Sequence, residues 1–162
     1  MEKKLAPTDE EMNRWRKKFR QLSNSARYRE AHELSKKLVK QYPSVILFAY
    51  YEAVMTAEQE VGFSKAQVKA RQKLAAKKLR KLLYRARAMT LGQRNSMRNE
   101  YYWFSRQPHK QYRLGLERVK AGEKSSYYSQ GVGAEQVAKN YALRGRKALC
   151  LRWAKKSENL DR

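Results

Sequence analysis

Lysine and arginine are the side chains whose spacing in this sequence most clearly suggests a chemistry. No acidic residue occurs between Glu60 and Glu100, and that stretch contains Lys65, Lys69, Arg71, Lys73, Lys77, Lys78, Arg80, Lys81, Arg85, Arg87, Arg94 and Arg98. Ammonium and guanidinium groups bind phosphate oxygens, and each phosphate that they neutralise releases counterions. We therefore expect this stretch to bind a phosphate backbone.

A second stretch without acids runs from residue 136 to residue 157, and three of its cations, Arg144, Arg146 and Lys147, lie at a predicted turn. Side chains at a turn can reach outward to a ligand. The predicted nucleic-acid-binding residues are Lys69, Arg71, Lys73, Lys77, Lys78, Arg80, Lys81, Arg85, Arg87, Arg94, Arg98, Arg144, Arg146 and Lys147.

Four consecutive aromatic residues, Tyr101 to Phe104, lie between Arg98 and Arg106. Four neighbours cannot all face one stripe of a helix, so one or two of them should be exposed. Exposed rings among cations can stack on unpaired bases, and Tyr101 and Tyr102 are the candidates for this role. The competing interpretation, that these rings belong to a helical core, carries more weight.

Catalytic and metal-binding patterns are weak. Arg27 and His32 resemble the short Arg-His motif of the HEPN family of helical ribonucleases, in which such a pair cleaves RNA across a dimer. The histidine could move a proton and the arginine could stabilise phosphate charge, but this spacing is common by chance. His32, His109 and Cys150 are the only histidine and cysteine residues in the sequence. We therefore expect no metal site, no cofactor and no catalytic residue.

The charge is large and unevenly distributed. The 162 residues carry a net charge of +23, and residues 1–60 hold twelve Lys and Arg against nine Asp and Glu, whereas residues 61–162 hold twenty-six against six. Such a charge suits nucleic acid or an anionic membrane, and in some small basic proteins it serves only for association with ribosomes or for solubility. One cysteine, no apolar leader and no membrane-length apolar stretch favour a cytoplasmic protein that does not bind membranes.

The positions of the helices follow from apolar spacing and from capping signals. Thr8 with Glu11, and Ser64 with Gln67, form capping-box patterns at two helix starts. Pro43 and Gly62 end the second and third helices, and the fourth helix extends to about Met89. Gly92 marks the next turn, Pro108 begins the sixth helix, and Arg144-Gly145 separates the seventh from the eighth. Residues 123–133 fit either a short helix or a loop.

Two segments resemble tetratricopeptide repeats. In the first, Trp15 is the early aromatic, Tyr28 opens the second helix, Ala31 is the small packing residue and Pro43 is the closing proline. Residues 134–157 are similar, whereas the long helix from Ser64 departs from the repeat, so the resemblance covers roughly half of the chain. It implies a right-handed helical superhelix with a concave groove, a family that binds proteins and occasionally RNA.

The sequence therefore predicts an all-α protein in which helical hairpins stack as a short tetratricopeptide-like solenoid or bundle. It predicts one domain over residues 1–162, with flexible tails at residues 1–7 and 158–162. The expected function is binding of nucleic acid with limited sequence specificity, and RNA is favoured over DNA. No enzymatic activity is expected. The alternative is an adaptor for protein–protein interaction whose basic face docks an acidic partner.

Overall fold

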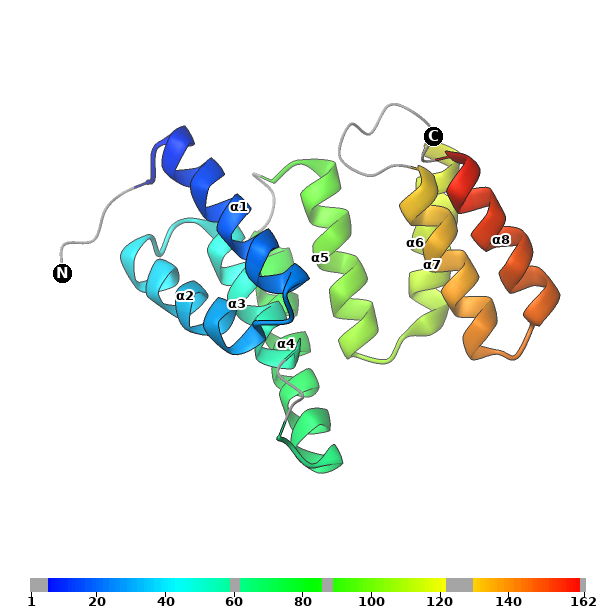
Figure 1. The fold of residues 1–162 in the computed structure, drawn as a ribbon, viewed down its shortest axis with the longest axis horizontal. Helices are drawn as coiled ribbons and strands as arrows, with labels where there is room; N and C mark the ends of the chain where they lie inside the picture. Colours follow the sequence, from blue (N-terminus) through cyan, green and yellow to red (C-terminus); the bar gives the residue numbers. More distant parts are fainter. Residues whose placement is uncertain (1–5, 59–61, 86–88, 122–129, 161–162) are drawn as a thin grey trace. The chain divides into compact units, whose positions relative to one another are not determined.

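The chain is all-α. A computed structural model describes residues 6–58, 62–85, 89–121 and 130–160, and Figure 1 shows the helices in this part of the chain. Their bounds are α1 Asp9–Asn24, α2 Tyr28–Gln41, α3 Ile46–Glu58, α4 Lys65–Arg85, α5 Leu91–Phe104, α6 Pro108–Ala121, α7 Gln130–Leu143 and α8 Lys147–Leu160. Contacts divide the chain, for which the sequence suggested one domain, into two compact units, Met1–Arg87 and Ala88–Arg162.

In the first unit each helix packs against the next one along the chain. Apolar side chains of α1, α2 and α3 meet in a core that includes Phe19, Leu38, Tyr42 and Phe48. The ring of Phe19 stacks on that of Tyr51 at 4.3 Å between centroids. An aromatic pair of this kind stabilises the fold beyond the burial of its apolar area. It holds α1 against α3, in addition to the packing of α1 on α2.

Both predicted capping boxes are present. The Thr8 hydroxyl accepts from the backbone N–H of Glu11, and the Glu11 carboxylate accepts from the backbone N–H of Thr8. Ser64 and Gln67 exchange the same pair of bonds at the start of α4. These bonds satisfy backbone donors that have no partner inside the helix, which is why the starts were visible in the sequence.

Two boundaries differ from the sequence prediction, and a segment that was left open is partly assigned. Gly92 does not mark a turn but lies within α5, because Thr90 caps that helix and Gln93 completes a third capping box. Of the segment that fitted either a short helix or a loop, residues 130–133 belong to α7, and residues 122–129 lie outside the described residues. The helix α8 continues to Leu160, into the segment expected to be a tail.

Close backbone contact between α6 and α7 organises the second unit. A Cβ atom added to Gly115 would lie 2.9 Å from the carbonyl oxygen of Gly133, and one added to Gly133 would lie 2.8 Å from the Cβ atom of Arg118. Glycine at both positions lets the two helices approach, and Leu114 and Val137 are fully buried beside them. This contact positions α7 relative to α6.

The same backbone turn joins three helix pairs. Ala26, Arg106 and Gly145 have positive φ angles of 53°, 55° and 66°. In each turn the next residue donates its N–H to a carbonyl five residues earlier, from Arg27 to Leu22, from Gln107 to Tyr102 and from Arg146 to Tyr141. This is the Schellman arrangement, which normally places glycine at the left-handed position. Only the third turn has the glycine that made it recognisable in the sequence.

This turn geometry predicts opposite effects for two substitutions. Arg106→Gly should raise the free energy of unfolding by about 0.5–1 kcal/mol, because glycine adopts a positive φ without a steric cost. Gly145→Ala should lower it by about 1 kcal/mol, since an added Cβ meets nothing within 4 Å and only the backbone conformation is penalised. Urea denaturation followed by circular dichroism measures both, and equal signs for the two variants would contradict the prediction.

Candidate nucleic-acid interface

The two sides of α4 have opposite character. Ala75, Leu79 and Leu82 are buried on the side that packs against α3. Seven cations are exposed on the remaining circumference: Lys65, Lys69, Lys73, Lys77, Arg80, Lys81 and Arg85. We call these seven side chains the α4 basic face.

Six of the seven cations follow one another at intervals of four residues, from Lys65 to Arg85. Four residues of α-helix rise about 6 Å and turn about 40°, so the row winds by about 200° around α4 over an axial length of about 30 Å. Arg80 lies beside this row. The described residues contain no ion pair between any of the seven and a carboxylate. Like charges so spaced repel one another, and an anionic ligand relieves that repulsion.

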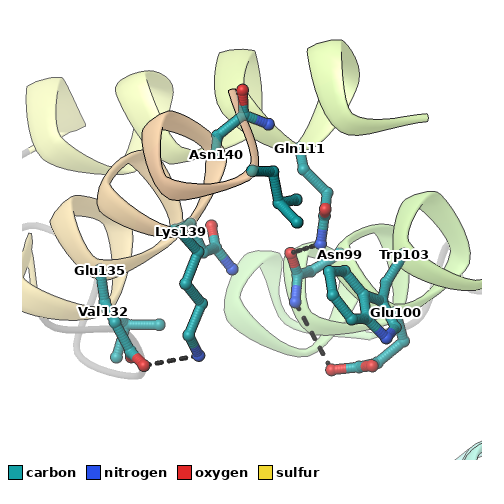
Figure 2. A pocket seen from close by; sticks show the side chains of 10 residues that line it. Asn99, Glu100, Trp103, Gln111, Val132, Glu135, Lys139 and Asn140 are labelled. Atoms are coloured by element: carbon teal, nitrogen blue, oxygen red, sulfur yellow. Dashed lines mark hydrogen bonds and ion pairs between the residues drawn. The ribbon is translucent and has the colours of Figure 1, made fainter. Parts of the chain in front are cut away.

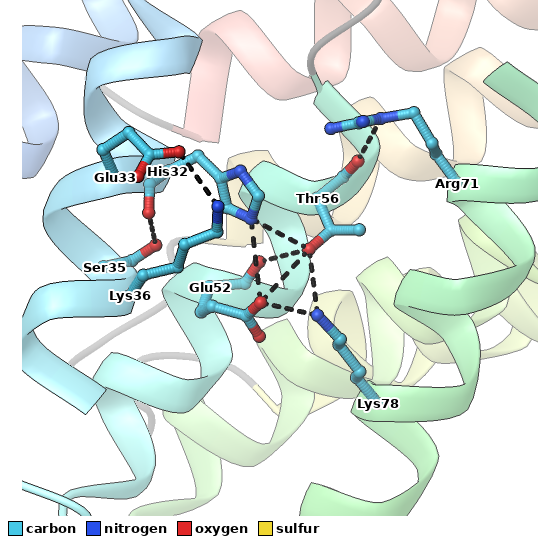
Figure 3. A network of polar contacts seen from close by, with 8 residues as sticks. All are labelled: His32, Glu33, Ser35, Lys36, Glu52, Thr56, Arg71 and Lys78. Carbon is cyan, nitrogen blue, oxygen red and sulfur yellow. Dashed lines mark hydrogen bonds and ion pairs between the residues drawn. The ribbon is translucent and has the colours of Figure 1, made fainter. Parts of the chain in front are cut away.

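Lys78 and Arg71, which the sequence placed with the other cations, are bonded within the first unit (Figure 3). The Lys78 ammonium lies 2.5 Å from a carboxylate oxygen of Glu52 and also contacts the Thr56 hydroxyl. The Arg71 Nε donates to the carbonyl of Thr56 at 2.9 Å, and its guanidinium lies over the ring of Phe63. Both side chains link α4 to other parts of the unit.

His32 lies in the same polar network, which joins α2, α3 and α4. Its Nε2 is 3.3 Å from the Thr56 hydroxyl and 3.7 Å from the Glu52 carboxylate, and its exposed fraction is 9%. Burial lowers the pKa of the imidazole below its ordinary value, and the nearby positive charge of Lys36 lowers it further. The network therefore favours neutral His32.

Arg27, the other half of the Arg-His pattern, has a different partner. Its guanidinium donates two hydrogen bonds to the exposed carboxylate of Glu30, each at 2.6 Å. This bond lowers the pKa of Glu30. Arg27 thus engages Glu30 at the surface, whereas His32 faces Thr56 and Glu52 in the interior.

One of the four consecutive rings is exposed, as expected, but it is Trp103, at 48%, and not Tyr101 or Tyr102. Tyr101 and Tyr102 are partly buried, lie 5.6 Å apart between ring centroids and belong to α5. The most exposed aromatic side chain among the described residues is Tyr84, at 73%. By helical rotation it lies on the same side of α4 as Lys77, Arg80 and Lys81. Tyr84 was not selected from the sequence, although its position opposite the buried Ala75, Leu79 and Leu82 of the same helix was the available signal.

The other predicted site residues belong to the second unit or lie outside the described residues. Arg94 and Arg98 are partly buried on α5, and Arg98 lies 3.9 Å from a carboxylate oxygen of Glu117. Arg144, Arg146 and Lys147 are exposed at the turn between α7 and α8, as expected. The Arg144 guanidinium lies 5.6 Å from the ring centroid of Tyr112. Arg87 lies outside the described residues.

Comparison with protein-family models, with curated proteins and with solved structures gives no match. Over the described residues, no group of three or more His, Cys, Asp and Glu side chains could bind a metal ion. In that same part of the chain, no helix has both the length and the apolar character of a membrane span. The functional inference therefore rests on the side chains described above.

The environment of His32 predicts a pH dependence of stability. Because the folded state holds the pKa of His32 down, the unfolded chain takes up a proton first as the pH falls below about 6.5. The free energy of unfolding should therefore be unaffected by this group above that pH and should decrease as the pH falls towards the lower folded pKa. Thermal unfolding of the native protein and of His32→Gln between about pH 7.5 and 5 measures this contribution. The variant should lose less stability over this range than the native protein, and an equal loss in the two would contradict the prediction.

Proposed function

We propose that this protein binds nucleic acid, RNA in preference to DNA, through the α4 basic face. The observation that carries the proposal is the row of exposed cations on a helix whose opposite side is packed, a row that pairs with no carboxylate in the part of the chain that the structure describes. Side chains about 6 Å apart can contact successive phosphates while the stems stay on one helix. Contacts of this kind read the backbone, so sequence preference is weak.

Tyr84 supports a ligand that has unpaired bases. An exposed ring surrounded by ammonium groups can stack on a base whose phosphates are bound by the neighbouring lysines. In a regular duplex the bases are already stacked on one another. We therefore favour single-stranded RNA or a loop over duplex DNA.

We also infer that the helical hairpins are repeats of the tetratricopeptide type. The shared turn at Ala26, Arg106 and Gly145 supports this inference, because one backbone pattern recurs where the sequences differ. Ala31, assigned to the small packing position of the motif, has an exposed fraction of 0%. A repeat scaffold is compatible with RNA and with protein ligands.

The proposal predicts strongly salt-dependent binding. Fluorescence anisotropy of labelled single-stranded RNA, duplex RNA and duplex DNA should show the tightest binding to the single strand. A log–log salt slope of about −3 corresponds to four or five neutralised phosphates. Replacing Lys73, Lys77 and Lys81 together with Gln should reduce the magnitude of that slope by about 2.

The matched control replaces Lys17, Lys37 and Lys40 with Gln, three exposed lysines on α1 and α2 that give the same change in net charge. Its slope should stay within about 0.5 of the native value. If both triple variants lose affinity equally, the charge acts without a defined site and the α4 interface is wrong. If no nucleic acid binds at low salt, the basic face serves an acidic protein and the adaptor function replaces this one.

Two neighbouring lysines separate binding from stability. Lys77→Met should weaken RNA binding and leave the unfolding temperature nearly unchanged, because its ammonium lies on the exposed side of α4. Lys78→Met should leave the salt slope unchanged and lower stability by about 1–2 kcal/mol, since it leaves the partly buried Glu52 carboxylate without its cation. Anisotropy and thermal unfolding of both variants test this, and an equal loss of binding in both would contradict it.

Tyr84→Ala tests the stacking contact separately. Loss of one stacked base should weaken single-stranded RNA binding by about tenfold while the salt slope stays the same. Duplex binding should change by less than about threefold. A change in slope, or an equal loss for all three ligands, would remove Tyr84 from the interface.

A further inference from the structure

The second unit contains a cleft between α5, α6 and α7, which Figure 2 shows from close by. Its volume is about 350 Å³, at the lower end of the range found for small-molecule sites. It is lined by Asn99, Glu100, Trp103, Gln111, Val132, Glu135, Gln136, Lys139, Asn140 and Leu143. The close approach of α6 and α7 at Gly115 and Gly133 determines where its α7 side lies.

A large aromatic ring and an aliphatic side chain contribute the apolar surface of this cleft. Trp103 has an exposed fraction of 48% and Leu143 of 64%. Figure 2 places Trp103 beside Glu100, across the cleft from Lys139 and Glu135. An indole with an exposed face is the best cation–π partner among the aromatic side chains, and here it lies beside a carboxylate.

The charge of the cleft is opposite to that of its surroundings. Residues 88–162 hold sixteen Lys and Arg against six Asp and Glu. Among the described residues that line the cleft, the ionisable side chains are Glu100, Glu135 and Lys139, with a net charge of −1. A phosphate would be repelled here relative to other surfaces of the unit, whereas a positively charged group would be attracted.

Hydrogen bonds hold the amides that line the cleft. Gln111 donates to the Asn99 side-chain oxygen at 3.1 Å, and the Asn99 amide donates to the Glu100 carboxylate at 3.5 Å. Asn140, with an exposed fraction of 2%, donates to the backbone carbonyl of Pro108. The amides of Gln111 on α6 and of Asn99 thus orient the Glu100 side chain. An oriented side chain loses little conformational entropy when a ligand binds.

From this combination we propose that the cleft binds an arginine side chain of a partner polypeptide. The guanidinium lies against the face of Trp103 and donates hydrogen bonds to the carboxylates of Glu100 and Glu135, and the aliphatic stem contacts Leu143. Arginine suits the site better than lysine because its planar, weakly hydrated head can stack and can donate several hydrogen bonds at once. This binding site is independent of the α4 basic face.

Lys139 gives the site an internal competitor. Its ammonium lies 2.6 Å from a Glu135 oxygen, and the exposed fractions of the two side chains are 67% and 51%. An exposed pair with i,i+4 spacing is weak, so an incoming guanidinium can replace the ammonium. Removal of the Lys139 charge should therefore strengthen the binding of an arginine ligand and weaken the binding of a nucleotide ligand.

The test uses the full chain and a fluorescein-labelled Gly/Ser peptide with one central arginine, at about 0.15 M salt so that charges beyond about 8 Å are screened. The same peptide with citrulline keeps the shape and removes the charge. Anisotropy should show binding of the arginine peptide and at least about fivefold weaker binding of the citrulline peptide. Equal binding of the two peptides would overturn the proposal.

Three variants assign that binding to the cleft. Trp103→Ala should weaken arginine-peptide binding by about fivefold, and Glu135→Gln by about threefold. Lys139→Met should strengthen it by about threefold. A gain in affinity cannot result from misfolding, so this variant keeps the test valid if Trp103→Ala is unstable.

The same variants with labelled single-stranded RNA distinguish the two classes of ligand. If Lys139→Met weakens RNA binding while Glu135→Gln strengthens it, and the arginine peptide does not respond, the cleft binds a nucleotide and the proposal is wrong. If RNA binding follows only the α4 variants while the peptide follows only the cleft variants, the two sites are separate, as proposed. Failure of RNA binding altogether would overturn the function proposed for α4 and leave the peptide result unaffected.

Discussion

Electrostatic repulsion among the cations of α4 is the unfavourable interaction that packing in the first unit must offset. The seven exposed cations lie on a helix whose other side is held by burial of Ala75, Leu79 and Leu82. The carboxylate of Glu52 binds Lys78 on the packed side and leaves the outward row without partners. Apolar packing therefore stabilises a charge distribution that an isolated helix would not favour. This separation of a packing side from a charged side gives a binding surface a fixed geometry.

In the second unit the corresponding constraint is steric rather than electrostatic. Gly115 and Gly133 allow α6 and α7 to approach until their backbones touch, and Leu114 and Val137 are fully buried beside this contact. The approach leaves a cleft between α5 and α7 that polar side chains line and that Trp103 and Leu143 keep partly apolar. The two units thus offer different chemistries, a row of cations in one and a slightly acidic cleft with an exposed indole in the other.

Much of the local structure could be predicted because its signals are local. The capping boxes at Thr8 and Ser64, the proline at the start of α6 and the glycine after α7 each satisfy a backbone requirement within a few residues. The prediction at Gly92 was wrong because glycine was taken as a turn signal, whereas the adjacent Thr90 and Gln93 cap a helix that contains it. The turn at Arg106 was not recognised because an arginine occupies a conformation that usually requires glycine.

What the sequence determined by itself was the helical fold class, the placement of most helices and the excess of positive charge, since these depend on composition and on short-range periodicity. Only the tertiary structure decided which cations point outward. Lys77 and Lys78 are neighbours of the same type, yet one is exposed and the other lies against Glu52, because a helix rotates about 100° per residue. The cleft likewise could not be predicted, since Trp103, Lys139 and Gln111 come from three helices and meet only through the packing of those helices.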